Sequence, residues 1–69
     1  MGILGNRIAE IRKKKGMKQQ QLADILEIER TALSGIENGK YDASPKTMKK
    51  TSDVFQMPIG EIFFNPSVQ

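Results

Sequence analysis

Two short amphipathic segments follow one another closely in the stretch from Gln19 to Lys40, QQQLADILEIERTALSGIENGK. Its apolar residues recur at helical spacing in two groups, with Ile28 in the connection between them; the residues are Leu22, Ala23, Leu26, Leu33 and Ile36. Because only a few residues separate the two groups, the stretch predicts helices at residues 19–26 and 30–38, joined by a tight turn.

The second of these helices would leave Arg30, Thr31 and Ser34 on its outer side. These side chains are short or polar, and all of them can form hydrogen bonds. A helix that packs inward beside a second helix with outward polar groups is the geometry of a helix-turn-helix, whose second helix lies in a groove of DNA. The local pattern therefore predicts DNA binding.

Further apolar groups predict three more short helices, at residues 6–15, 44–55 and 59–64. The sequence shows no internal repeat and no convincing alternating strand pattern. We therefore expect an all-α protein, in which five short helices surround one core. Residues 1–69 would form a single domain, with the core within residues 4–64 and a short C-terminal tail at residues 65–69.

Local signals at the helix ends support these boundaries. Gly16 and Gly39 follow two of the predicted helices, at positions where a left-handed residue commonly ends a helix. Ser44 is suited to cap the helix that follows it, and Pro45 is suited to its first turn.

The composition argues against several classes of function. The 69 residues include no cysteine and no histidine, which removes disulfides, thiolate chemistry and the commonest general base and metal ligand. No carboxylate pair, nucleophile–base pair or glycine-rich phosphate loop emerges, so we expect neither an enzyme nor a bound metal or cofactor. No apolar run approaches the ~20 residues of a membrane span, and a chain without cysteine fits the reducing cytoplasm.

The charges are unevenly distributed along a chain of net charge +3. Six basic residues precede residue 19, against the single acid Glu10, and a second basic group follows residue 39. The acids between the two groups are Asp24, Glu27, Glu29 and Glu37. Such asymmetry suits a polyanion bound on one face, although a solvated lysine surface would give the same pattern.

Three motifs along the chain carry a family resemblance. They are RIAEIRKKKGMKQQQLADIL, IERTALSGIENGKYDASP and VFQMPIGEIF. With these motifs the chain resembles the phage-repressor-like, Cro/cI-type helix-turn-helix regulators, also called the Xre family. The resemblance covers about residues 4–64. It implies a compact five-helix, lambda-repressor-like domain that binds double-stranded operator DNA, usually as a dimer.

Residues near the ends of the two central helices are candidates for contacts with DNA phosphates. A helix N-terminus presents unpaired N–H groups and a partial positive charge, so we expect Gln19 to hold the DNA backbone, with Lys18 adding a cation. At the far end of the second helix, Asn38 and Lys40 could grip another phosphate. Tyr41 either adds a hydroxyl contact there or packs against the domain.

Base reading is assigned to the exposed N-terminal part of the second helix. Arg30 can form a bidentate contact with a guanine edge, and Thr31 can pair with a base or touch a thymine methyl group. Ser34, one turn beyond Arg30, could bond to a base or a phosphate. The alternatives for Arg30 are a phosphate contact or a surface ion pair with Glu27 or Asp24.

The resemblance also implies an internal ion pair between Arg12 and Glu37, which would tie the first helix to the third. Removing one partner of such a pair would strand a partly buried charge. Glu27 replaces a glycine that is frequent in the turn, so the turn would need a non-glycine residue in a left-handed conformation.

Three further positions depart from the family's pattern. Lys18 and Glu29 stand where a serine or threonine cap is usual, and Glu29 places a negative charge near DNA. Gly35 occupies a position that often carries a long base-reading side chain. It either lets the backbone approach DNA closely or gives up a contact.

Apolar residues crowd the C-terminal segment. Pro58, Ile59 and Phe64 are candidates for a two-fold dimer contact, with Ile62 and Phe63 in the core. A dimer would set two recognition helices about one DNA turn, ~34 Å, apart and would imply a pseudo-palindromic operator. The alternative is a tail that folds back over the core of a monomer.

Together these features predict a sequence-specific DNA-binding transcriptional regulator. It would act as a dimeric repressor or controller that occupies a promoter, or as an activator that touches polymerase from an adjacent site. The alternative is a protein-interaction module, such as an antitoxin or a regulator whose main partner is another protein that docks on the C-terminal helix. A protein partner of either kind of regulator could be polymerase or an antagonist. A steep dependence of DNA affinity on salt would separate the two.

Overall fold

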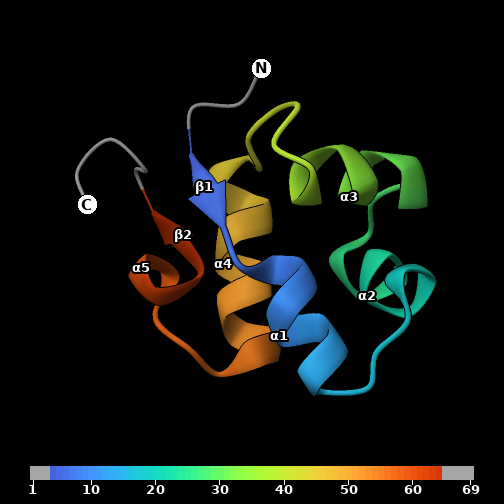
Figure 1. Ribbon diagram of the computed structural model, residues 1–69, viewed down its shortest axis with the longest axis horizontal. Helices are drawn as coiled ribbons and strands as arrows, with labels where there is room; N and C mark the ends of the chain where they lie inside the picture. Colours follow the sequence, from blue (N-terminus) through green and yellow to red (C-terminus); the bar gives the residue numbers. More distant parts are fainter. Residues whose placement is uncertain (1–3, 65–69) are drawn as a thin grey trace.

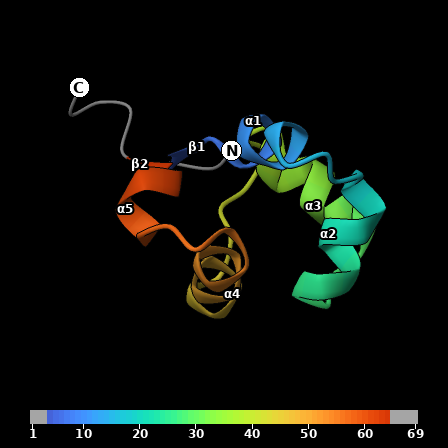
Figure 2. The same ribbon diagram turned by 90° about the horizontal axis from the view of Figure 1, so that it is seen from below.

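Helices make up most of the structure, a computed structural model that describes residues 4–64. The helices are α1 (Ile8–Lys14), α2 (Gln19–Leu26), α3 (Arg30–Glu37), α4 (Pro45–Phe55) and α5 (Ile59–Ile62), and the short strands are β1 (Gly5–Asn6) and β2 (Phe63–Phe64). In both views α2 and α3 lie at one end of the molecule and α5 with β2 at the other, with α1 and α4 between them (Figures 1 and 2). The prediction of five helices is confirmed, and the tail expected at residues 65–69 lies outside the described residues.

The hydrophobic core draws on every helix. Each of the five helices contributes at least one of its most deeply buried apolar side chains, and these include Ile8, Leu22, Leu33, Phe55 and Ile62. The two apolar groups recognised between residues 19 and 40 are likewise buried, so α2 and α3 pack inward on the faces that their spacing predicted. No helix within residues 4–64 is both long enough and apolar enough to cross a membrane.

A two-stranded antiparallel sheet joins the two ends of the described chain. Gly5 pairs with Phe64, and Asn6 pairs with Phe63. The predicted helix at residues 6–15 therefore begins only at Ile8, and the one predicted at residues 59–64 ends at Ile62. The sequence shows no strand pattern at these positions, because the two partners are distant in sequence and local periodicity carries no signal of their pairing.

Helices α1 to α4 all end in the same way. The residues Gly16, Glu27, Gly39 and Gln56 have φ angles of 70°, 59°, 76° and 54°. In each case the next N–H donates to the carbonyl five residues earlier, at 2.9 to 3.2 Å, which is the Schellman arrangement. The left-handed conformation expected of Glu27 is confirmed, and Gln56 is a second non-glycine residue in this region.

Replacing Gln56 by glycine is expected to stabilise the protein. A left-handed conformation costs a residue with a side chain roughly 1–2 kcal/mol, so the free energy of unfolding should rise by about 1 kcal/mol after the entropy of glycine is counted. Gly16→Ala is the matched control, because a Cβ there meets nothing within 4 Å while φ remains 70°. Urea unfolding should show a higher free energy of unfolding for Gln56→Gly and a lower one for Gly16→Ala. Two changes of the same sign would contradict the assignment of left-handed strain to Gln56.

Candidate nucleic-acid interface

The outer side of α3 forms a shallow depression of about 380 Å³ together with the loop that follows it. Its lining residues are Arg30, Thr31, Ser34, Gly35, Asn38, Lys40 and Tyr41. The three residues expected to read bases and three of the five expected to hold phosphates are thus brought together on one surface. Asn38 donates from Nδ2 to Ser34 Oγ at 3.4 Å, and the Lys40 side chain is exposed to solvent.

A buried ion pair fixes the orientation of α3 against α1. Arg12 Nε lies 2.8 Å from Glu37 Oε2, and the two side chains are only 10% and 5% exposed. Arg12 also donates from Nη1 to the carbonyl of Met17 at 2.9 Å, which satisfies a further guanidinium proton. The pair inferred from the resemblance is therefore present, and it lies on the inner side of the α3 surface.

Gln19 links this ion pair to the outer surface. Its Nε2 donates to Glu37 Oε1 at 2.9 Å, and its Oε1 accepts from Arg30 Nη1 at 3.2 Å. Both ends of the amide are therefore engaged within the protein, which the sequence did not indicate. A phosphate would meet the backbone N–H groups that begin α2 more readily than this side chain.

Arg30 donates to Gln19 and not to Glu27 or Asp24, the two acids predicted as alternative partners. Glu27 lies 3.2 Å from Lys50 Nζ, and Asp24 accepts from Gln20 at 2.7 Å. The Arg30 side chain remains exposed, so its outer edge is open to a ligand.

The first turns of α2 and α3 lack the usual serine or threonine caps. The Lys18 N–H donates instead to Gln21 Oε1 at 2.7 Å, which is one half of a capping box. Glu29 has an extended backbone before α3 and makes no side-chain cap hydrogen bond. Glu29 nevertheless occupies the N-cap position, where a negative charge interacts favourably with the positive end of the helix dipole.

Gly35 and Tyr41 are in direct contact. A Cβ placed on Gly35 would lie 2.5 Å from both Cζ and Oη of Tyr41, so the ring lies against the glycine backbone. The Tyr41 hydroxyl donates to the carbonyl of Thr31 at 3.5 Å. The sequence predicts a role of Gly35 toward DNA alone, whereas the structure shows that its missing side chain makes room for this ring.

Comparison with known proteins assigns the fold to a family. The helix-turn-helix family matches residues 8–62, which include all five helices. The chain belongs to this family. Its α2 and α3, joined at the left-handed Glu27, are the two helices that give the family its name.

Relatives of this helix-turn-helix domain include phage and bacterial proteins. The ImmF control region 10 kDa protein of Bacillus phage phi105 is 39% identical over 56 residues, which cover 81% of this chain and 62% of that protein. Control protein C.MunI of a Mycoplasma species is 33% identical over 60 residues, or 86% of this chain and 81% of the relative. The restriction-modification controller protein C.AhdI of Aeromonas hydrophila superposes with a TM-score of 0.72 at 27% identity, covering 80% of this chain and 83% of the other.

Several relatives are longer than this chain. It spans between 34% and 62% of the length of four curated proteins that it matches. Those proteins therefore contain further sequence beyond the helix-turn-helix domain that is shared.

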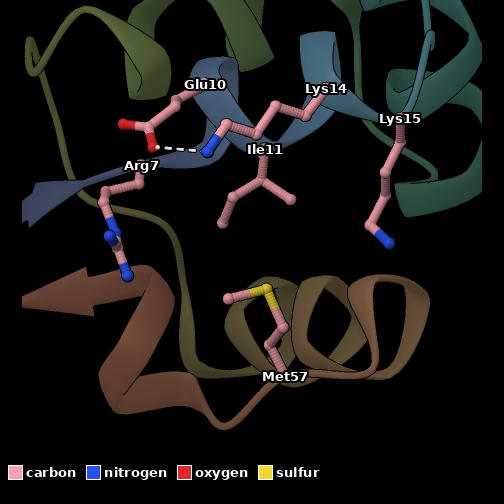
Figure 3. Close-up of a pocket in the computed structure, with 6 residues that line it drawn as sticks. All are labelled: Arg7, Glu10, Ile11, Lys14, Lys15 and Met57. Carbon is pink, nitrogen blue, oxygen red and sulfur yellow. Dashed lines mark ion pairs between the residues drawn. The ribbon is translucent and has the colours of Figure 1, made fainter.

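A second depression on the helix-turn-helix domain, of about 350 Å³, contains none of the residues expected to contact DNA. Figure 3 shows Ile11 and Met57 pointing toward each other across it, with Lys15 to one side. Lys14 lies 3.6 Å from Glu10, so part of the positive charge here is paired. Because Arg12 is internal and Lys14 and Lys15 line a separate depression, these members of the basic N-terminal group do not line the depression on α3.

The residues expected at a dimer contact differ in their surroundings. Pro58 is exposed, and Ile59 is 41% exposed. Phe64 is half-buried, and its ring covers Gly5, where an added Cβ would lie 2.5 Å from Phe64 Cε2. Part of the Phe64 surface is therefore already used within its own chain.

Proposed function

We propose that this helix-turn-helix domain is a sequence-specific DNA-binding transcriptional regulator that places α3 in the major groove. The observation that carries the proposal is the concave, hydrogen-bonding surface of α3, whose orientation is held from behind by the Arg12–Glu37 pair. The names of its relatives, which include control proteins, a repressor and transcriptional regulators, agree with this function.

The residues divide by what they can offer to DNA. We assign base reading to Arg30, Thr31 and Ser34, which lie on the outer side of α3. We assign phosphate contacts to the residues at the two ends of the motif, which are Lys18, Gln19 through its backbone N–H, Asn38 and Lys40.

The same proposal includes a homodimer on a pseudo-palindromic operator. Pro58 and Ile59 offer exposed apolar surface for a two-fold contact, and Phe64 contributes the part of its ring that Gly5 leaves uncovered. Occupying a promoter would repress transcription, and contact with polymerase or an antagonist protein would modulate it. We infer that the domain acts in the cytoplasm and by binding alone, without catalysis.

A salt titration tests the proposal and includes the variant Lys40→Ala. Wild-type affinity for duplex DNA should fall steeply between about 50 and 200 mM salt. The reason is that the lysine and arginine side chains of the protein displace counterions from the DNA phosphates when they bind. Lys40→Ala should weaken binding to all duplexes alike and lower the slope of log affinity against log salt by about 1.

Lys49→Ala is the matched control, since it removes the same charge from the exposed side of α4. It should leave the slope almost unchanged. If wild-type binding does not respond to salt, or if the protein binds no duplex, the alternative of a protein-interaction module is favoured.

A further inference from the structure

Gly35 lies in the middle of the outer side of α3, where the sequence offers no side chain to DNA. Thr31 and Ser34 precede it on this surface and Asn38 follows it. Although it faces the depression, Gly35 is buried. The Tyr41 ring accounts for this burial, because its Cζ, Oη and Cε1 atoms all approach within 2.6 Å of the place where a Cβ would stand.

The loop after α3 brings Tyr41 back over the helix. Gly39 has φ of 76°, and the Lys40 N–H donates to the Gly35 carbonyl at 2.9 Å. The chain therefore changes direction at Gly39 and Lys40, immediately before Tyr41. The ring then extends toward the preceding turn, where its hydroxyl meets the Thr31 carbonyl at 3.5 Å.

Tyr41 thus presents an aromatic surface where α3 itself presents nothing. Tyr41 as a whole residue is 46% exposed, although one part of its ring rests on Gly35. The hydroxyl already has an acceptor on the helix, so the ring carbons form much of the surface that a ligand would meet. In the major groove, the group that matches an apolar carbon surface is the 5-methyl group of thymine.

We propose that Tyr41, seated on Gly35, is a specificity-determining residue that contacts a thymine methyl group in the major groove. This inference rests on the proposed function, because it requires α3 to lie in that groove. It replaces the expected phosphate contact of Tyr41 with a base contact made at the middle of α3. Gly35 acts as the positioning residue, since any side chain there would displace the ring.

The test begins with duplexes selected from a random pool by the wild-type protein. Tyr41→Ala should lose the preference for thymine at one position in each half-site, and should bind the selected duplex at least ~5-fold more weakly. Tyr41→Phe should keep the preferred sequence, because it keeps the ring carbons. Replacing that thymine by uracil, which lacks only the methyl group, should weaken DNA binding by the wild type. It should leave DNA binding by Tyr41→Ala unchanged.

Gly35→Ala provides an independent arm. In the wild-type background it should displace the ring, relax the same base preference and lower the thermal midpoint of unfolding. In the Tyr41→Ala background it should leave base preference unchanged and raise the midpoint, because alanine then fits a helix better than glycine. The change in thermal midpoint caused by Gly35→Ala thus has opposite signs in the two backgrounds. This difference distinguishes displacement of the Tyr41 ring from a general failure to fold.

Different results would overturn different statements. Tyr41→Ala could select the same sequence as the wild type and bind every duplex more weakly by the same factor. In that case Tyr41 binds phosphate, and the inference fails while the proposed function stands. If the wild type selects no sequence, both fail. If the uracil substitution weakens DNA binding by Tyr41→Ala as much as binding by the wild type, another residue contacts the methyl group and the inference fails.

Discussion

Replacing Glu37 by alanine is expected to unfold most of the protein. The change strands the Arg12 guanidinium, whose side chain is only 10% exposed, and removes the acceptor of Gln19 Nε2. Breaking a buried pair by removing one partner typically costs about 3–5 kcal/mol. A single small core rarely supplies more than about 3–5 kcal/mol, so the loss approaches the whole stability of this domain. Urea unfolding followed by circular dichroism measures the effect.

An exposed ion pair in the same protein gives the matched control. Glu10 lies 3.6 Å from Lys14, and the two side chains are 53% and 76% exposed. Glu10→Ala should therefore cost less than about 1 kcal/mol. A double variant, Arg12→Met with Glu37→Met, should be more stable than Glu37→Ala, because it leaves no unpaired charge. If Glu37→Ala costs no more than Glu10→Ala, the buried pair does not hold α3 in place.

Replacing Arg30 by alanine is expected to produce the largest change in DNA preference. The guanidinium is exposed at the start of α3 and is steadied by Gln19 Oε1, so its other donors can meet a guanine edge. Loss of a bidentate contact removes about 1–3 kcal/mol of discrimination, or roughly 5- to 150-fold at one base position. Titration against duplexes with single-base substitutions measures this preference, and unfolding should show little change.

Arg30→Lys separates base reading from charge. Lysine keeps the positive charge but lacks the planar fork that matches a guanine edge. The salt dependence of binding should therefore stay close to that of the wild type, while the base preference falls. If Arg30→Ala lowers the affinity for every duplex by the same factor, Arg30 contacts phosphate and does not read a base.

The helices could be predicted because each depends on residues close together in the chain. The spacing of Leu22, Leu26, Leu33 and Ile36 is local, and so is the signal of Gly39 at the end of α3. The β1–β2 pair could not be found in this way. In its register Gly5 pairs with Phe64, whose ring covers it, and this is a contact between opposite ends of the described chain.

The positions of the candidate residues on α3 were predictable, but the arrangement of their side chains was not. The polar residues of α3 follow from helical periodicity, and the depression gathers them as expected. The engagement of Gln19 with both Glu37 and Arg30 depends on side-chain conformations that a sequence does not specify. The seating of Tyr41 on Gly35 depends on the reversal of the loop after α3. A glycine within a helix, followed by a glycine at the helix end and then an aromatic residue, is a signal that could have indicated it.

Selection of bound duplexes from a random pool tests the central claim most directly. Sequence-specific binding by a dimer through α3 predicts two enriched half-sites in inverted orientation, with centres about one DNA turn, ~34 Å, apart. Each half-site should contain a guanine whose enrichment disappears in the pool selected by Arg30→Ala. A wild-type pool with no enriched sequence would contradict the claim.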